Sequence, residues 1–293
     1  MVVLVNPKSG LMWSFDAMRR AFDRHWEVRP EVDLKYQFTQ SVEDGEGKAR
    51  ACVEEGVDTV IVVGGDGTLS TIGRVLVDTN VALGVVPVGS GNGFARHFGI
   101  SLSPEKAIVQ MASAERQAID VGHVNGKPFF VTCSMAWDAS IVSGFDRLPV
   151  RGVLPYVFAG VEEFFEYRPQ QMKVVLDGEE TLSFDNALVF TVANLTQFGG
   201  GARIAPHARP DDGRLELVVA LRQDIAKLVT NITRLFDGSL SKLPEVVFRS
   251  FKSMRVEREE PTPIQIDGEL VECERDVDVT VSSGGLSVLV PAG

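Results

Sequence analysis

The stretch from Val60 to Thr68, Val-Ile-Val-Val-Gly-Gly-Asp-Gly-Thr, constrains the fold of this chain most strongly. Four consecutive β-branched residues are typical of a strand buried in a parallel sheet, and the glycines after them indicate a tight turn. A helix is expected over Leu69 to Asp78. Because a strand, a glycine turn and a helix start direct backbone amides at one point, the stretch predicts a phosphate site. Asp66 would repel phosphate unless a cation lay between them, so we expect Mg²⁺ with a nucleotide.

The segments around this stretch repeat the order strand, loop and helix. Polar or glycine-rich loops follow several strands, at the carboxyl ends where open parallel sheets bind ligands. Residues 1–120 are therefore predicted to form an α/β domain with a parallel, Rossmann-like sheet. The further elements expected there are strands over Val2 to Val5, Leu34 to Phe38 and Val81 to Val88, and helices over Trp13 to His25 and Val42 to Glu55.

After about Ile119 the helical spacing nearly disappears, and short apolar strands recur between turns. Such a run is typical of an antiparallel sandwich, so residues 121–285 are predicted to form a mostly antiparallel β-sandwich domain. A last strand in residues 286–293 is expected to return to either domain. The expected elements are strands over Phe129 to Cys133, Met172 to Leu176, Ala187 to Ala193, Leu215 to Ala220, Val246 to Phe251, Ile264 to Ile266, Val277 to Val281 and Leu286 to Val290, and helices over Val153 to Tyr167 and Ile225 to Phe236.

Charge and composition limit the classes of partner. The formal net charge of −11 argues against nucleic acid as the main partner. No stretch approaches the length of an apolar membrane span, and no basic-then-apolar signal segment opens the chain. We therefore expect a cytoplasmic protein. The three cysteines and four histidines show no metal-ligand spacing, which argues against zinc.

Four motifs follow one another along the chain. They are Asn6-Pro-Lys-Ser-Gly10, Gly64-Gly-Asp-Gly-Thr68, Pro87-Val-Gly-Ser-Gly-Asn92 and Asp267-Gly-Glu269. The two glycine loops among them fit neither the Walker nor the dinucleotide fingerprint. In this order the motifs resemble the diacylglycerol kinase and sphingosine kinase superfamily, above all the bacterial soluble lipid kinases, over the whole chain. The second motif alone is shared with NAD kinases.

This resemblance implies an NAD kinase/diacylglycerol kinase-like architecture, with ATP bound in a cleft between the two domains. Asp66 and Asp120 would organise the catalytic Mg²⁺ through water. Asp267 would be the general base, with Glu269 beside it, and Asp138 would meet the lipid head group. The residues expected to contact the nucleotide are Asn6, Ser9, Thr39, Gly65, Asp66, Gly67, Thr68, Ser90, Gly91 and Asn92.

The resemblance also implies a second, structural metal site at Ala208-Arg-Pro-Asp-Asp-Gly-Arg214. Its ligands would be the Asp212 carboxylate and the carbonyl oxygens of Arg209 and Arg214. Oxygen ligands of this kind suit Mg²⁺ or Ca²⁺. From the residues alone, the segment reads equally as a turn before the strand at Leu215.

The leading hypothesis is an ATP-dependent lipid kinase that phosphorylates a primary hydroxyl. A soluble-metabolite kinase of the NAD kinase type and a non-catalytic nucleotide-binding regulator are the alternatives; the Asn-Glu dipeptide of NAD kinases is absent. Ser90 and Gly93 depart from the usual diacylglycerol kinase pattern, so the lipid stays open between diacylglycerol, a long-chain base and related lipids. We expect transient contact with a membrane surface, and a homodimer is left open.

Overall fold

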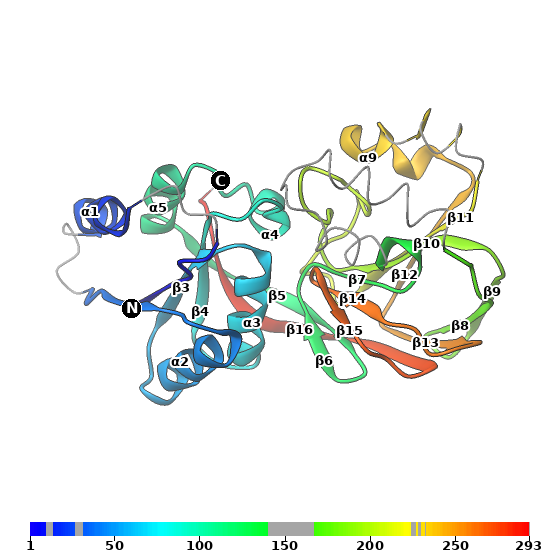
Figure 1. The fold of residues 1–293 in the computed structure, drawn as a ribbon, viewed down its shortest axis with the longest axis horizontal. Helices are drawn as coiled ribbons and strands as arrows, with labels where there is room; N and C mark the ends of the chain where they lie inside the picture. Colours follow the sequence, from blue (N-terminus) through cyan, green and yellow to red (C-terminus); the bar gives the residue numbers. More distant parts are fainter. Residues whose placement is uncertain are drawn as a thin grey trace. The chain divides into compact units, whose positions relative to one another are not determined.

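The computed structural model describes residues 1–9, 14–26, 32–139, 167–223, 227, 230–231 and 233–292. The chain divides into two compact units (Figure 1). The first comprises Met1–Ile119 with Gly284–Gly293, and the second comprises Asp120–Ser283. Among the described residues, no helix combines the length and the apolar character needed to cross a membrane.

A parallel sheet forms the centre of the first unit. Its strands are β1 (Val2–Val5), β2 (Lys35–Phe38), β3 (Thr59–Gly64) and β4 (Ala82–Pro87), in the order β2-β1-β3-β4. All six residues of β3 and of β4 are buried, as the run of β-branched residues predicts for a strand covered on both faces. The end of β16 (Asp276–Val290) lies parallel to β4, where Val288 pairs with Leu83.

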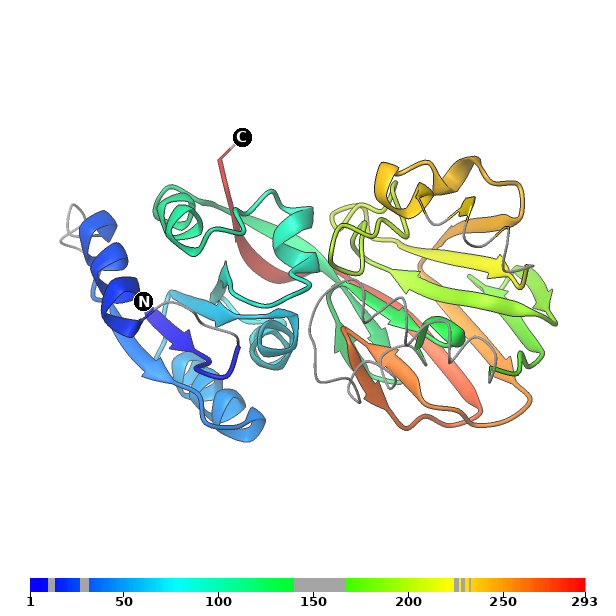
Figure 2. The ribbon, with the colours of Figure 1, turned by 45° about the horizontal axis from the view of Figure 1, so that its top comes forward.

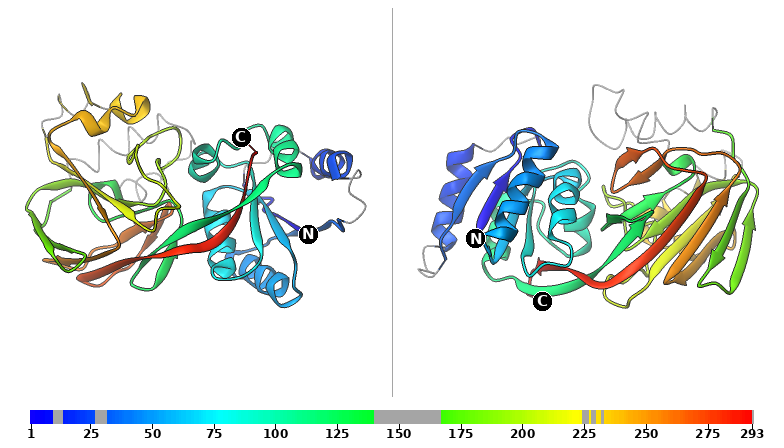
Figure 3. Two further views of the ribbon diagram at one scale, coloured as in Figure 1. Left: turned by 180° about the vertical axis from the view of Figure 1, so that it is seen from behind. Right: turned by 90° about the horizontal axis from the view of Figure 1, so that it is seen from below.

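Helices cover both faces of this sheet, and Figure 3 shows them on either side of the strands. α1 packs against α5, and α2 packs against α3. The Ser41 hydroxyl caps α2 by accepting the Asp44 amide at 3.2 Å. The helices of this unit are α1 (Phe15–Trp26), α2 (Val42–Glu54), α3 (Asp66–Leu76), α4 (Gly93–His97) and α5 (Pro104–Ala112).

The prediction for the helix after β3 was wrong at its start. The helix begins at Asp66 instead of Leu69, because Gly65 is extended and its carbonyl oxygen already accepts the Leu69 amide at 3.0 Å. Gly67 and Thr68 therefore lie in the first helical turn. The short helix α4 was not predicted at all. Its start is held by the side chain of Asp66, the first residue of α3, as described below.

The second unit consists of antiparallel strands with side chains packed between two layers. One sheet has the order β12-β11-β10-β7-β14-β15, and its long strands β10 and β11 lie side by side in Figure 2. The other layer contains β13 paired with β8 and β16. The strand β5 (Glu115–Val124) begins in the first unit and ends in the second. The other strands of the second unit are β6 (Lys127–Phe129), β7 (Thr132–Ser134), β8 (Met172–Leu176), β9 (Glu180–Phe184), β10 (Ala187–Ala193), β11 (Leu215–Leu221), β12 (Val246–Phe251), β13 (Ser253–Arg258), β14 (Ile264–Ile266) and β15 (Glu269–Val271).

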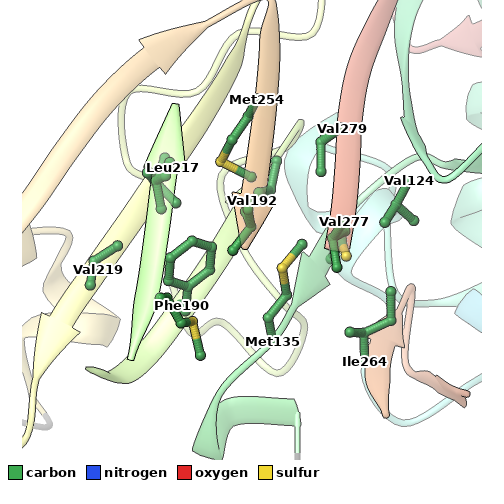
Figure 4. Close-up of a cluster of buried hydrophobic side chains, with 14 of the residues drawn as sticks. Val124, Met135, Phe190, Val192, Leu217, Val219, Met254, Ile264, Val277 and Val279 are labelled. Carbon is green, nitrogen blue, oxygen red and sulfur yellow. The ribbon is translucent and has the colours of Figure 1, made fainter. Parts of the chain in front are cut away.

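Apolar side chains from both layers form the core of this unit. Phe190 and Leu217 come from one layer, and Met254 and Val277 come from the other (Figure 4). All four are buried. The fold-class prediction is thereby confirmed, with an α/β domain on a parallel sheet followed by an antiparallel β domain.

Two strand predictions were wrong in detail. The single strand expected over Phe129 to Cys133 is broken, since β6 ends at Phe129 and β7 begins at Thr132. The two strands expected at the C-terminus are one strand, β16. The helix expected over Val153 to Tyr167 lies outside the described residues except for Tyr167 itself.

The helix expected over Ile225 to Phe236 lies only partly among the described residues. These include the short helix α9 (Arg234–Asp237), which is followed by the 3₁₀ turn η1 (Leu240–Lys242). A second, smaller apolar cluster, which includes Ile204, Val218 and Leu240, lies beneath this segment.

Candidate active site

Two glycine loops touch at the carboxyl ends of β3 and β4. Gly64 pairs with Pro87 at the ends of these strands. A Cβ atom on Gly89 would lie 2.7 Å from the Gly65 Cα atom, and one on Gly65 would lie 3.2 Å from the Gly89 Cα atom. Because the two backbones are in direct contact, glycine is required at both positions. The structure thus brings together two motifs that lie far apart in the sequence.

Asp66 ties the same two loops together with its carboxylate. Its Oδ2 accepts the Gly93 amide at 3.1 Å, and its Oδ1 accepts the Phe94 amide at 3.3 Å. These amides open α4, so a carboxylate caps the positive end of that helix. Burial raises the pKa of Asp66 above the usual range for an aspartate, while the amides of α4 and the charge of Arg96 oppose the rise.

The first strand contributes a polar cluster beside these loops. Asn6 Nδ2 donates to Thr68 Oγ1 at 2.7 Å, and the Ser9 hydroxyl lies 3.5 Å from the same oxygen. Asn6 Oδ1 accepts the Lys8 amide at 2.9 Å, which fixes the orientation of the Asn6 amide group. These residues follow β1 and β3, where the strand order reverses and open α/β sheets bind ligands.

The remaining predicted nucleotide residues line the ends of β2 and β4. Thr39 follows β2 and donates through its hydroxyl to the Val5 carbonyl oxygen at 3.4 Å. Asn92 has a left-handed backbone, with φ of 52°, and exchanges two hydrogen bonds with Gly89 at 3.1 and 2.8 Å. Gly91 accepts a hydrogen bond from Arg96 Nε at 3.0 Å, so the loop that holds Ser90 and Gly91 has a fixed shape.

These loops can bind a phosphate chain. The first amides of α3, which include Gly67 and Thr68, have no intrahelical acceptor, and no side chain caps the helix at Gly65. Such amides at a helix start bind anions. The donor set therefore fits the triphosphate of a nucleotide.

Asp267 lies in the second unit, in the two-residue turn of the β14–β15 hairpin. Ile266 pairs with Glu269 across the turn, and Asp267 and Gly268 have φ of 48° and 90°. Asp-Gly with positive φ at both positions is the signature of a type I′ turn. The same backbone can present a side chain for chemistry, so the turn and the proposed base are compatible.

The Asp267 carboxylate is buried against a run of backbone amides. Oδ1 accepts from Phe130, Val131 and Thr132 at 3.2, 2.8 and 3.2 Å, and Oδ2 accepts from Phe130 at 3.0 Å. These donors stabilise negative charge on a side chain that is only 5% exposed. The amides of Phe130 and Val131 donate to Asp267 instead of to a neighbouring strand, which explains why β6 ends at Phe129 and β7 begins only at Thr132.

Asp138 and Glu269 occupy two other places in the second unit. Glu269 is the first residue of β15. Asp138 accepts the Ala136 amide at 3.2 Å and the Phe190 amide at 3.4 Å, and it accepts a hydrogen bond from the Thr191 hydroxyl. Burial raises the pKa of Asp138, against the effect of these hydrogen bonds.

Asp120 contacts the loop in which the structural metal was predicted. Its Oδ2 accepts the Gly213 amide at 2.6 Å, and its own amide donates to the Pro210 carbonyl oxygen at 2.6 Å. Asp212 accepts the Arg214 amide at 3.0 Å, which closes a local turn. The structure thus joins two predicted metal groups that sequence reasoning kept apart, Asp120 and the Arg209–Arg214 loop.

Asn194 is a positioning residue that sequence reasoning missed. It is 1% exposed, and its Nδ2 donates to the carbonyl oxygens of Asp120 at 2.8 Å and Phe130 at 3.0 Å. Asn194 therefore connects Asp120 to Phe130, whose amide donates to the Asp267 carboxylate. The signal in the sequence was a single amide side chain at the end of the apolar strand β10.

The described carboxylates, Asp66 among them, suit a metal ion that would be held mainly through water and phosphate. Within the described part of the chain, no group of three or more His, Cys, Asp or Glu side chains could hold a metal. Both Asp66 oxygens already accept backbone amides, so a metal ion at these loops would reach this carboxylate through water more readily than by direct ligation. Mg²⁺ usually keeps several waters and binds through one or two carboxylates with substrate phosphates.

Comparisons with known proteins match both parts of the chain to families. The family model of the diacylglycerol kinase catalytic domain matches residues 1–124, and that of the YegS C-terminal NAD kinase beta sandwich-like domain matches residues 132–290. The chain is 30% identical to a diacylglycerol kinase of Mycobacterium tuberculosis over 302 residues, which cover 98% of this chain and 94% of the relative. It is 31% identical to the "Probable lipid kinase YegS-like" of Pseudomonas aeruginosa over 257 residues, which cover 85% and 83%.

A solved structure shares the fold at low sequence identity. It is a diacylglycerol kinase from Bacillus anthracis str. Sterne, with a TM-score of 0.74 and 20% identity, and the match covers 99% of this chain and 96% of that one. Two matched domains and a relative aligned over nearly its whole length define a class of protein, the lipid kinases. The chain belongs to the diacylglycerol kinase family and is a phosphotransferase, so the resemblance seen in the motifs is confirmed.

Proposed function

We propose that the chain is an ATP-dependent lipid kinase that transfers the γ-phosphate to a primary hydroxyl of a lipid. The observation that carries this proposal is the contact between the two glycine loops, which Asp66 ties together at the start of α3. Amides and glycines placed in this way supply a phosphate cradle, and phosphoryl transfer depends mainly on positioning and charge neutralisation.

The first unit binds the nucleotide in this proposal. Asn6, Ser9 and Thr68 form one polar wall, which the 2.7 Å hydrogen bond from Asn6 to Thr68 supports. Gly65 and Gly67, with Ser90, Gly91 and Asn92 of the second loop, approach the phosphates with backbone donors, and Thr39 lies toward the nucleoside. When bound, ATP with Mg²⁺ supplies the transferable phosphoryl group and neutralises the charge that develops on it.

Asp267 accepts the proton of the attacking hydroxyl in this proposal. Its amide donors fix the orientation of the carboxylate and favour its negative charge, both of which a general base requires. Oδ1 has three amide contacts and Oδ2 has one, so we assign the proton to Oδ2. Glu269, which pairs with Ile266 across the turn, adds a second carboxyl group to the same hairpin.

The metal assignments follow the same pattern. Asp66 and Asp120 orient water molecules around the catalytic Mg²⁺, while Asp212 with the carbonyls of Arg209 and Arg214 holds a structural Mg²⁺ or Ca²⁺. The hydrogen bond from the Gly213 amide to Asp120 supports this proposal, because it joins a residue assigned to the catalytic metal to the loop assigned to the structural metal. Asp138 orients the lipid head group, and we propose that the protein acts from the cytoplasm in transient contact with a membrane surface.

The direct test is to incubate the protein with γ-labelled ATP, Mg²⁺ and a total lipid extract, and to separate lipids from water-soluble products. A lipid kinase labels a chloroform-soluble product, whose identity gives the acceptor. A parallel incubation with NAD in place of the lipid extract tests the NAD kinase alternative, which label in NADP would support. Nucleotide binding with no label on any acceptor would support a regulator.

A further inference from the structure

Arg258, the last residue of β13, is a buried cation in the second unit, and only 2% of its surface is exposed. Its guanidinium has five N–H groups, and five hydrogen bonds use them. Nε donates to the Arg275 carbonyl oxygen at 3.2 Å, and Nη1 donates to the carbonyl oxygen and the hydroxyl of Thr262 at 2.9 and 2.8 Å. Nη2 donates to the carbonyl oxygens of Glu274 and, at 3.5 Å, of Cys273.

The acceptors of these hydrogen bonds are main-chain oxygens and one hydroxyl, whereas a buried arginine usually pairs with a carboxylate. Burial lowers the pKa of the Arg258 guanidinium, which reflects the cost of removing this charge from water. An apolar side chain of similar size would avoid this cost, but it could not join the segments that the guanidinium joins. The contribution of Arg258 therefore lies in the geometry that it fixes.

The partners of Arg258 lie on both sides of the β14–β15 hairpin. Thr262 precedes β14, and residues 273–275 follow β15, so the guanidinium joins the two segments through which the hairpin is attached to the chain. β14 and β15 lie beside β7 (Figure 1), and β14 pairs with β7 through Gln265 and Ile266. In the described sheet β15 is the last strand, next to β14. The hairpin thus depends on a short ladder and on the contacts at its two ends.

Asp267 lies in the turn of this hairpin, and its contacts depend on how the hairpin is placed against β7. The Asp267 amide donates to the Thr132 carbonyl oxygen at 2.9 Å, and its carboxylate accepts the amides of residues 130–132. A rotation or shift of the hairpin would move the carboxylate away from these amides. Small displacements of a reacting group slow a reaction strongly, so the placement of the hairpin should affect the rate of proton transfer.

We propose that Arg258 is a positioning residue for phosphoryl transfer, because it holds the two ends of the β14–β15 hairpin together and thereby fixes the Asp267 carboxylate. Arginine suits this role, since its planar fork presents several donors in fixed directions, whereas lysine has a flexible point charge. Arg258 acts through Asp267, so the proposal rests on the proposed function.

The test is a double-mutant cycle that combines Arg258→Met with Asp267→Asn. Single-turnover transfer of labelled γ-phosphate to extracted lipid is measured in the wild type, both single variants and the double variant, well below their unfolding midpoints. Calorimetry gives the MgATP affinity of each. Arg255→Met is the matched control, because it removes an exposed arginine of the same strand, whose guanidinium donates to the carboxylates of Asp276 and Asp278.

We expect Arg258→Met to slow transfer about 10- to 100-fold at unchanged MgATP affinity, and to cause no further loss in the Asp267→Asn background. Arg258→Lys should transfer at a rate between those of Arg258→Met and the wild type, and Arg255→Met at the wild-type rate. A wild-type rate in Arg258→Met, the same fold loss in both backgrounds, or an equal loss in Arg255→Met would each overturn the proposal. If Arg258→Met does not fold, Arg258→Lys takes its place in the cycle.

Amide hydrogen exchange distinguishes the failure of this proposal from the failure of the kinase assignment, because it requires no turnover. In Arg258→Met the amides of Phe130 and Val131 should exchange faster than in the wild type, while those of β10 and β11 exchange at unchanged rates. This result in a protein without any kinase activity would count against the proposed function alone. Unchanged exchange and an unchanged rate in Arg258→Met, where Asp267→Asn is inactive, would count against Arg258 alone.

Discussion

Single carboxylates in this protein combine structural contacts with the roles proposed for them. Asp66 accepts two amides of α4, and Asp267 accepts amides from three consecutive residues. A substitution at either position therefore changes backbone geometry as well as charge. Experiments at this scale need a readout that separates the two effects.

Replacing Asp66 should damage nucleotide binding through the second loop. Asp66→Ala leaves the Gly93 and Phe94 amides without their acceptor, at a cost of about 1–3 kcal/mol for each amide that stays buried. We expect weaker MgATP binding in calorimetry together with a lower unfolding midpoint. Unchanged MgATP affinity in Asp66→Ala would contradict both proposed roles of Asp66, which are to shape the second glycine loop and to orient water around Mg²⁺.

Asp138 should make stability depend on pH. Because burial raises its folded pKa, its favourable contribution is complete below its unfolded pKa and is lost as pH rises through the folded value. Asn at this position does not titrate and can keep the amide contacts, and Thr191 can reverse its hydrogen bond. The neighbouring Tyr167 and Cys133 stay neutral in this range, since burial raises the pKa of each.

We therefore expect the free energy of unfolding of Asp138→Asn, relative to the wild type, to shift in favour of the variant as pH rises above about 4, the ordinary pKa of an aspartate. Urea titrations at several pH values give this difference. A difference that is constant with pH, or that shifts toward the wild type as pH rises, would contradict the sign of the pKa shift.

At the scale of elements, the loops rather than the strands define the site. The apolar runs of β1, β3 and β4 were predicted correctly because a strand buried on both faces has an unmistakable composition. The start of α3, the helix α4 and the break between β6 and β7 were not predicted. The last two depend on partners far away in the sequence, Asp66 for α4 and Asp267 for the break, and the local sequence of a segment does not reveal such partners.

The contact between the glycine loops gives a prediction at this scale. Gly89→Ala places a Cβ atom 2.7 Å from the Gly65 Cα atom, so the two backbones must separate. We expect a loss of about 1–3 kcal/mol in unfolding free energy and a loss of nucleotide affinity.

The matched control is Gly47→Ala in the middle of α2, where an added Cβ atom meets nothing within 4 Å. Alanine there should raise stability by about 0.5–1 kcal/mol and leave nucleotide binding unchanged. Equal nucleotide affinity in Gly89→Ala and the wild type would show that the close approach of the loops is not needed for binding.

At the scale of the whole molecule, the chain distributes the proposed chemistry over two units. The phosphate loops belong to Met1–Ile119, and Asp267 belongs to Asp120–Ser283. The family and the order of the two domains, which the sequence motifs predicted, are confirmed, while the residues that the motifs assign to the site stay a prediction. The motifs did not reveal that Asp120 contacts Gly213 or that Asn194 connects Asp120 to Phe130, because these contacts join segments without any shared local pattern.

The central claim is that the second unit supplies the base for phosphoryl transfer to a lipid. It is tested most directly by single-turnover transfer of labelled γ-phosphate from ATP to extracted lipid, in the wild type and in Asp267→Asn, with circular dichroism to confirm that the variant is folded. We predict a rate reduced about 10²–10⁴-fold at unchanged MgATP affinity. Transfer at the wild-type rate by folded Asp267→Asn would contradict the assignment.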